Sequence, residues 1–241
     1  MPEVHPIARN LAAVRARLEQ AARTAGRDPA TVRLVAVSKN FPPEAVLAAA
    51  AAGQVDFGEN RVQEGLQKIR ATADHQIRWH LIGHLQSNKA KRAAQSFAAI
   101  HSIDSLDLLR RVDEGATEVG QHPTLLVQVD LAGETTKFGA PEADLPGIFG
   151  AAGTLRSARL AGLMVLPPYS DDPEGARPWF RRLRAIRDAL LQSGVSPDTL
   201  QELSMGMSHD FHVAIEEGAT IVRVGTAIFG ERPAIAGAEN L

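Results

Sequence analysis

The chain has 241 residues, a formal net charge of −2, and 44% hydrophobic and 22% charged residues, which is ordinary for a globular protein. This charge offers no basic field for nucleic acid or an anionic membrane, and the absence of cysteine excludes disulfides, thiolate metal sites and a cysteine nucleophile. The sequence also lacks a signal region and an apolar run of about 20 residues that could span a bilayer, so we expect a cytoplasmic protein.

The predicted elements begin with an amphipathic helix within residues 1–28 and continue as alternating strands and helices. Apolar residues recur at three-to-four spacing in the first helix, at Ile7, Leu11, Val14 and Leu18. The predicted strands are 32–38, 55–58, 78–83, 98–101, 124–130, 159–166, 201–204 and 220–224. The helices between them include 44–52, 60–71, 106–119 and 179–192.

This alternation predicts an α/β protein with parallel strands, and eight strand–helix units favour one closed (β/α)8 TIM-type barrel over residues 31–232. No linker, low-complexity tract or change of composition interrupts the chain, so residues 1–241 are predicted to form a single domain. A doubly wound open sheet is the alternative, since a single sequence fixes strand counts poorly.

Lys39 follows the first predicted strand, which is an apolar and β-branched run. The carboxyl end of such a strand is where ligands bind in α/β folds. Partial desolvation there favours the neutral amine, which is the form that condenses with an aldehyde. The alternative is a lysine that merely extends from the strand end into water.

The ends of the last two predicted strands have the residues of a phosphate-binding cup. Ser208 supplies a hydroxyl, Gly206 and Gly225 allow close approach of the backbone, and Thr226 adds a hydroxyl and an N–H group. In barrels these two loops commonly bind phosphate. Arg223 lies within the last strand, so it is predicted to have an internal partner.

No metal site is predicted from the histidines. His80 and His84 are too far apart along a strand to share one ion, and His209 and His212 lack a third ligand nearby.

Five strings in the chain resemble the pyridoxal phosphate homeostasis proteins, also known as the YggS/PROSC family. They are VSK at 37–39, FGEN at 57–60, WHLIGHLQSNK at 79–89, LSMGMS at 203–208 and VRVGT at 222–226. The resemblance extends from the first strand to Arg232. It implies a barrel of fold-type III, similar to the barrel half of bacterial alanine racemases, with pyridoxal 5′-phosphate (PLP) held as an internal aldimine.

The resemblance also implies roles for individual residues. Lys39 matches the Schiff-base lysine and Arg223 the arginine that faces the pyridine nitrogen. The other matches are the phosphate cup (Ser208, Gly225 and Thr226), two residues near the ring (Asn60 and His84) and its apolar wall (Met205). The chain departs from the commonest family pattern at Asn40 and Phe41 and at His209 and His212, which are flanking positions.

An arginine at the ring nitrogen keeps the ring unprotonated and makes it a poor electron sink, which disfavours aminotransferase chemistry. Racemisation needs a second base besides Lys39. The only tyrosine, Tyr169, lies in a loop after the sixth strand and is interpreted as a loop residue, and Lys137 has no assigned role.

We therefore predict a monomeric PLP-binding protein without turnover, which buffers PLP and could deliver it to apo-enzymes. A weak amino-acid racemase is the second hypothesis, and a barrel that binds another phosphorylated metabolite is the third.

Overall fold

The structure, a computed structural model, describes residues 6–133 and 138–231, and its centre is a closed barrel of parallel strands. Each strand pairs with the next along the chain, and β8 pairs with β1 to close the barrel. The predicted barrel is thus confirmed, and the alternative prediction of a doubly wound open sheet is wrong. The strands are β1 (Arg33–Val37), β2 (Asp56–Glu59), β3 (Arg78–Leu81), β4 (Ala99–Ile103), β5 (Thr124–Gln128), β6 (Arg159–Met164), β7 (Glu202–Ser204) and β8 (Ile221–Val224).

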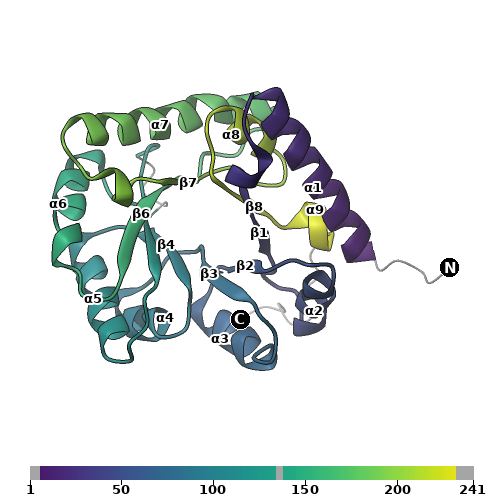
Figure 1. Cartoon of the computed structure of the whole chain (residues 1–241), viewed down its shortest axis with the longest axis horizontal. Helices are drawn as coiled ribbons and strands as arrows, with labels where there is room; N and C mark the ends of the chain where they lie inside the picture. Colours follow the sequence, from purple (N-terminus) through teal and green to yellow (C-terminus); the bar gives the residue numbers. More distant parts are fainter. Residues whose placement is uncertain (1–5, 134–137, 232–241) are drawn as a thin grey trace, which may run out of the picture.

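Helices surround the barrel (Figure 1). They are α1 (Pro6–Thr24), α2 (Pro43–Ala51), α3 (Val62–Ala71), α4 (Ala90–Ala94), α5 (Leu106–Thr117), α6 (Leu145–Gly150), α7 (Arg177–Gln192), α8 (Phe211–Glu216) and α9 (Thr226–Phe229). The eight predicted strands and the four helices predicted between them differ from these bounds by at most two residues, whereas the leading helix occupies Pro6–Thr24 of the predicted 1–28. Element ends depend on caps and loop contacts that periodicity does not contain. Lys137 and Arg232 lie outside the described residues.

The leading helix α1 packs across the outside of the barrel against α8, α9 and α2. Its predicted apolar stripe is buried, with Ile7, Leu11, Val14 and Leu18 all facing the core. None of the helices in the described ranges combines the length and the apolar character of a membrane span.

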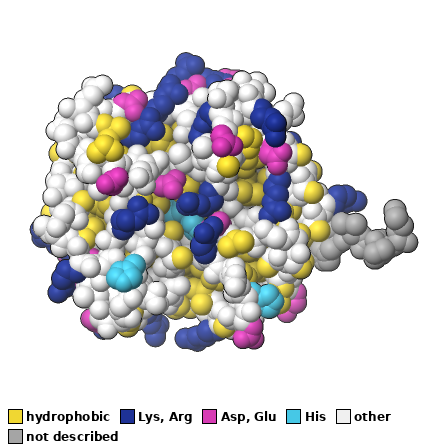
Figure 2. Space-filling view, in the orientation of Figure 1, with side chains coloured by type: hydrophobic (Ala, Val, Ile, Leu, Met, Phe, Trp, Pro, Cys, Tyr) yellow, Lys and Arg dark blue, Asp and Glu magenta, His cyan; other side chains and the backbone are white. Residues whose placement is uncertain are grey.

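The view in Figure 1 looks at the end of the barrel where the strands begin. The helices follow one another clockwise in this view. Strand–helix–strand connections in parallel sheets are right-handed, and around a barrel such connections run clockwise only when the viewer looks at the amino ends of the strands. Figure 2 has the same orientation and shows basic and acidic side chains around a histidine near the centre of this face. The carboxyl ends of the strands, where the predicted ligand residues follow, lie on the far face.

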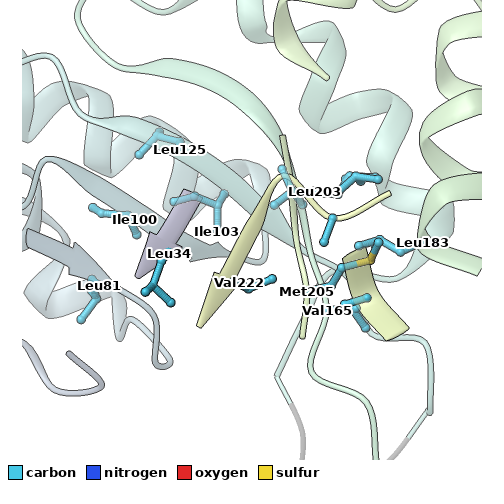
Figure 3. Close-up of a cluster of buried hydrophobic side chains, with 14 of the residues drawn as sticks. Leu34, Leu81, Ile100, Ile103, Leu125, Val165, Leu183, Leu203, Met205 and Val222 are labelled. Carbon is cyan, nitrogen blue, oxygen red and sulfur yellow. The ribbon is translucent and has the colours of Figure 1, made fainter. Parts of the chain in front are cut away.

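The apolar core has two layers. The larger one fills the space between the strands and the surrounding helices (Figure 3). The smaller one lies inside the barrel, because its members come from β1, β5, β6 and β8 and contact one another across it: Val35, Leu126, Met164 and Ile221. Polar side chains occupy much of the remaining interior, whereas apolar branched residues usually fill such barrels.

Candidate functional site

A cavity of about 540 Å³ lies at the carboxyl ends of the strands. This volume falls within the range of roughly 300–1,000 Å³ that is typical of small-molecule sites. The structure brings almost all of the predicted ligand residues to its lining, from the ends of five different strands. These are Lys39, Asn60, His84, Ser208, Arg223, Gly225 and Thr226.

Lys39 is partly buried and comes two residues after the end of β1. The next residue, Asn40, has a φ of 67°, in the left-handed region, so the chain turns sharply away from the strand. The Asn40 N–H donates to Glu64 Oε1 at 2.7 Å, and this bond ties the turn to α3. Lys39 is therefore presented on a short turn that is anchored on its far side.

A buried cluster of charged groups lies behind that turn. The Lys68 ammonium donates to Glu59 Oε1 at 2.6 Å, to Glu64 Oε1 at 2.9 Å and to the carbonyl oxygen of Ser38 at 2.7 Å. The Ser38 hydroxyl also donates to Glu59 Oε1, at 2.6 Å. These bonds fix the backbone immediately before Lys39. Sequence analysis missed Lys68. Its place on the buried face of α3, with Val62 and Gly65, could have indicated a lysine with a buried partner.

Burial has the largest effect on the pKa of the Glu59 carboxyl. Desolvation raises the pKa of Glu59 above its usual value, although hydrogen bonds from Lys68 and Ser38 oppose the rise. For Glu64 the balance is reversed: burial acts to raise the pKa, but the bonds from Lys68 and the Asn40 N–H outweigh it and lower the pKa. Within the described part of the chain, Glu59 Oε2 has no hydrogen-bond partner.

The predicted phosphate cup lies between the ends of β7 and β8. Ser208 Oγ accepts from the Gly225 N–H at 3.1 Å and from the Ala227 N–H at 3.5 Å. Gly206 has a φ of 92°, and a Cβ atom there would lie 2.5 Å from the Ala214 Cβ, so the turn requires glycine. A Cβ atom on Gly225 would lie 3.1 Å from the Val37 carbonyl oxygen, so the backbones of β1 and this loop approach closely.

Arg223 has the internal partners that its position on β8 predicted. Its side chain donates from Nη1 to Ser204 Oγ at 2.6 Å and from Nη2 to the Val165 carbonyl at 2.9 Å. Burial lowers the pKa of Arg223 to about 10, and the nearby Asp210 carboxylate opposes this effect. The guanidinium is therefore still cationic at neutral pH, and it lines the cavity.

Met205 is not in the cavity lining, so the structure does not place it as an apolar wall. The residue is fully buried, and Figure 3 shows its side chain pointing toward Leu183 of α7, outside the barrel. Side chains alternate along a strand, and Ser204 faces the interior, where it bonds Arg223. The next residue therefore faces outward, and Met207 lines the cavity instead.

His84 lies at the opposite side of the cavity from the cup, stacked on an aromatic ring that sequence analysis did not single out. The rings of His84 and Phe138 are parallel to within 11°, with centroids 3.5 Å apart. His84 Nδ1 lies 3.6 Å from Asp104 Oδ2. Burial raises the pKa of Asp104, and the charge of His84 acts in the opposite direction.

Tyr169 lies at the cavity mouth with 81% of its surface exposed. A hydrogen bond with Asp171 raises its pKa above the usual value for tyrosine. His209 is also exposed, and its Nε2 lies 2.8 Å from the Asp171 carbonyl oxygen. Among the described residues, no group of three or more histidines and carboxylates is placed to hold a metal ion.

Comparison with known proteins agrees with this geometry. Residues 9–233 match the family described as "Alanine racemase, N-terminal domain". The pyridoxal phosphate homeostasis protein of Pseudomonas aeruginosa is 46% identical over 227 residues, which cover 94% of this chain and 96% of that protein. The chain belongs to the pyridoxal phosphate homeostasis protein family.

Solved structures show the same fold. The structure of PipY from Synechococcus elongatus with PLP bound has a TM-score of 0.82 and 41% sequence identity, and the match covers 93% of this chain and all of that one. An alanine racemase from Clostridium difficile has a TM-score of 0.72 at 15% identity, with 95% of this chain and 57% of that one covered. At that identity the likeness to the racemase shows the fold alone.

Proposed function

We propose that this protein binds PLP covalently through the Lys39 amine and keeps it available in the cell, without turnover of its own. One observation carries the proposal: the Lys39 amine, the cup around Ser208 and the buried cation of Arg223 line a single cavity. The PipY structure, solved with PLP bound at 41% identity, supports the same ligand.

The residues present fit PLP. Ser208 and Thr226 would hold the phosphate through their hydroxyl groups, since such donors suit its oxygens. The Gly225 and Ala227 N–H groups, which donate to Ser208 Oγ in this structure, lie at the same place and would turn to the phosphate when it binds. Arg223 would face the ring nitrogen with a cation, which disfavours protonation there. When bound, PLP supplies an aldehyde that condenses with an amine. Lys39, on its anchored turn, would be the amine that meets it.

The proposal extends to delivery of PLP to apo-enzymes by a monomeric, cytoplasmic chain. The family name, with its reference to homeostasis, supports a role in PLP supply. The cavity mouth is suited to exchange with solution, because two of its aromatic side chains are largely exposed: Phe138 at 52% and Tyr169 at 81%.

A titration of the protein with PLP and with pyridoxal, followed by visible absorbance, tests the proposal. We expect the wild type to develop the absorbance of lysine-bound PLP, and borohydride reduction to leave one adduct by mass. Ser208→Ala removes one hydroxyl from the cup, so it should weaken PLP binding by about tenfold while hardly affecting pyridoxal, which has no phosphate. Equal weakening of both ligands would contradict the phosphate cup, and the absence of any adduct would contradict the function.

The racemase hypothesis predicts a second base, and Tyr169 is the candidate because it lines the cavity. The hydrogen bond with Asp171, and then the charge of that carboxylate, raise the pKa of Tyr169 instead of lowering it, which is unfavourable for a base at neutral pH. We therefore expect deuterium exchange at the α-carbon of alanine, followed by proton NMR, to stay near the rate with free PLP. Rapid exchange that Tyr169→Phe abolishes would instead establish an enzyme.

A further inference from the structure

A line of buried polar side chains crosses the interior of the barrel from Arg223 toward the opposite end. Ser204 Oγ, which accepts from Arg223, lies 2.9 Å from His101 Nδ1, and His101 Nε2 lies 2.9 Å from His80 Nδ1. His80 Nε2 in turn lies 2.9 Å from Asp56 Oδ1. All five side chains are buried, although they come from β2, β3, β4, β7 and β8.

The line ends at a second, smaller cavity of about 150 Å³, where the strands begin. Its lining includes Asp56, His80 and His101, with arginines around them, and basic and acidic side chains gather at the centre of this face in Figure 2. Arg78 closes the line by donating from Nε and Nη2 to the two carboxylate oxygens of Asp56, at 2.8 and 2.7 Å. The line thus has a cation at one end and a paired carboxylate at the other.

One arrangement of protons satisfies every ring nitrogen of this line with neutral imidazoles. Arginine can only donate, so Ser204 Oγ accepts from it and gives its own proton to His101 Nδ1. His101 then donates from Nε2 to His80, which donates from Nε2 to the Asp56 carboxylate. All bonds run in the same direction, from Arg223 to Asp56.

The charge states of the groups agree with this direction. Complete burial holds the pKa of His101 well below its usual value, and any positive charge at His80, Arg223 or Arg33 acts in the same direction, so the His101 ring is neutral. Burial alone would raise the pKa of Asp56, but the bonds from His80 and Arg78 hold it at about 2, so it remains an acceptor. An uncompensated polar group inside the barrel would be costly, and this line leaves neither histidine without a partner.

We propose that Ser204, His101, His80 and Asp56 are positioning residues that hold the Arg223 guanidinium in the orientation needed to face the ring nitrogen of PLP. The inference rests on the proposed function, and it assigns a task to the polar interior of the barrel. The bonds to Ser204 and Val165 use two of the five N–H groups of the guanidinium and fix its plane. Ser204 is itself oriented by His101, so the effect of the line reaches the cofactor only through Arg223.

The test compares PLP with its 1-deaza analogue, which has a carbon atom in place of the ring nitrogen and keeps the aldehyde and the phosphate. Covalent binding of each is titrated by absorbance in wild type and in Ser204→Ala. We expect the preference for PLP over the analogue to fall by about tenfold in the variant, as for the loss of one charge-assisted hydrogen bond, whereas binding of the analogue is unchanged. A purely structural role would weaken both ligands equally and would overturn the inference.

Ser102→Ala is the matched control, because Ser102 is a buried serine whose hydroxyl has no hydrogen-bond partner among the described residues. It should leave the preference intact. Along the line, His101→Leu should reduce the preference as Ser204→Ala does, and His101→Gln, which keeps a donor and an acceptor, should restore part of it. Equal preferences in His101→Leu and wild type would overturn the role of the line. Failure of the wild type to bind either compound would overturn the proposed function as well.

Discussion

Replacing Lys39 by alanine is expected to abolish both the visible absorbance of the bound cofactor and the borohydride-stable adduct. The reason is geometric: Lys39 lines the same cavity as the Ser208 cup and Arg223, and its turn is anchored from behind by Lys68 and Glu64. An amine that is held in position reacts as though its local concentration were very high, so a more distant lysine should not replace it.

Lys39→Arg is the matched variant for this experiment. Arginine retains the positive charge, but its guanidinium stays protonated and does not act as an amine nucleophile. Both variants should therefore lose the adduct, while Lys39→Arg preserves the charge of the cavity. Intact protein mass after borohydride reduction measures the result directly. A full adduct in Lys39→Ala, mapped by peptide mass to another lysine, would show that the assignment is wrong.

Lys68→Met is expected to have the largest effect on stability. The substitution removes the ammonium group that pairs Glu59 and Glu64 and leaves Glu59, which is fully buried, without its ionic partner. Breaking a buried ion pair by removing one partner typically costs about 3–5 kcal/mol, and we expect a loss of that size in the free energy of unfolding. Urea denaturation followed by circular dichroism is the measurement.

Lys91→Met is the control, because Lys91 pairs with Glu118 on the surface, with side-chain exposures of 62% and 51%. An exposed pair of this kind contributes at most about 1 kcal/mol. A double variant, Lys68→Met with Glu59→Gln, should recover part of the loss, since it removes the uncompensated charge. A destabilisation of Lys68→Met no larger than that of Lys91→Met would contradict the role of the buried cluster.

The pH dependence of the same variant provides a second readout. Burial already raises the pKa of Glu59, and Lys68 opposes the rise, so loss of Lys68 should raise the pKa further. A group with a raised pKa in the folded state binds more protons there than in the unfolded chain, and stability then falls as pH increases above the ordinary glutamate value of about 4.3. The deficit of Lys68→Met relative to wild type should therefore be larger at pH 8 than at pH 5.

Most of the fold was predictable because periodicity is a local property. The apolar stripe of α1 and the eight alternating strands follow from residue spacing alone, and all of them appear in the structure. The cavity residues were also accessible, because parallel strands in a barrel bring their carboxyl ends to one face. Lys39 and Ser208 could thus be placed together although 169 residues separate them in the chain.

Met205 shows where local reasoning failed. The string around it resembles the family, but a strand sends successive side chains to opposite faces, and a shift of one residue exchanges core and cavity. With Ser204 bonded to Arg223 inside the barrel, Met205 packs outside near Leu183 and Met207 enters the cavity. In a strand as short as β7, the pairing with β6 and β8 fixes which side chains face the interior of the barrel.

The sequence by itself determined the order of the elements, the barrel and the loops that build the cavity, because these depend on periodicity and on residue types at strand ends. Only the tertiary structure decided which side chains face one another inside the barrel. His101 meets Ser204 across 103 residues of chain, and Lys68 of α3 reaches the Ser38 carbonyl across 30. Such contacts arise from barrel closure and strand register, which no local pattern specifies.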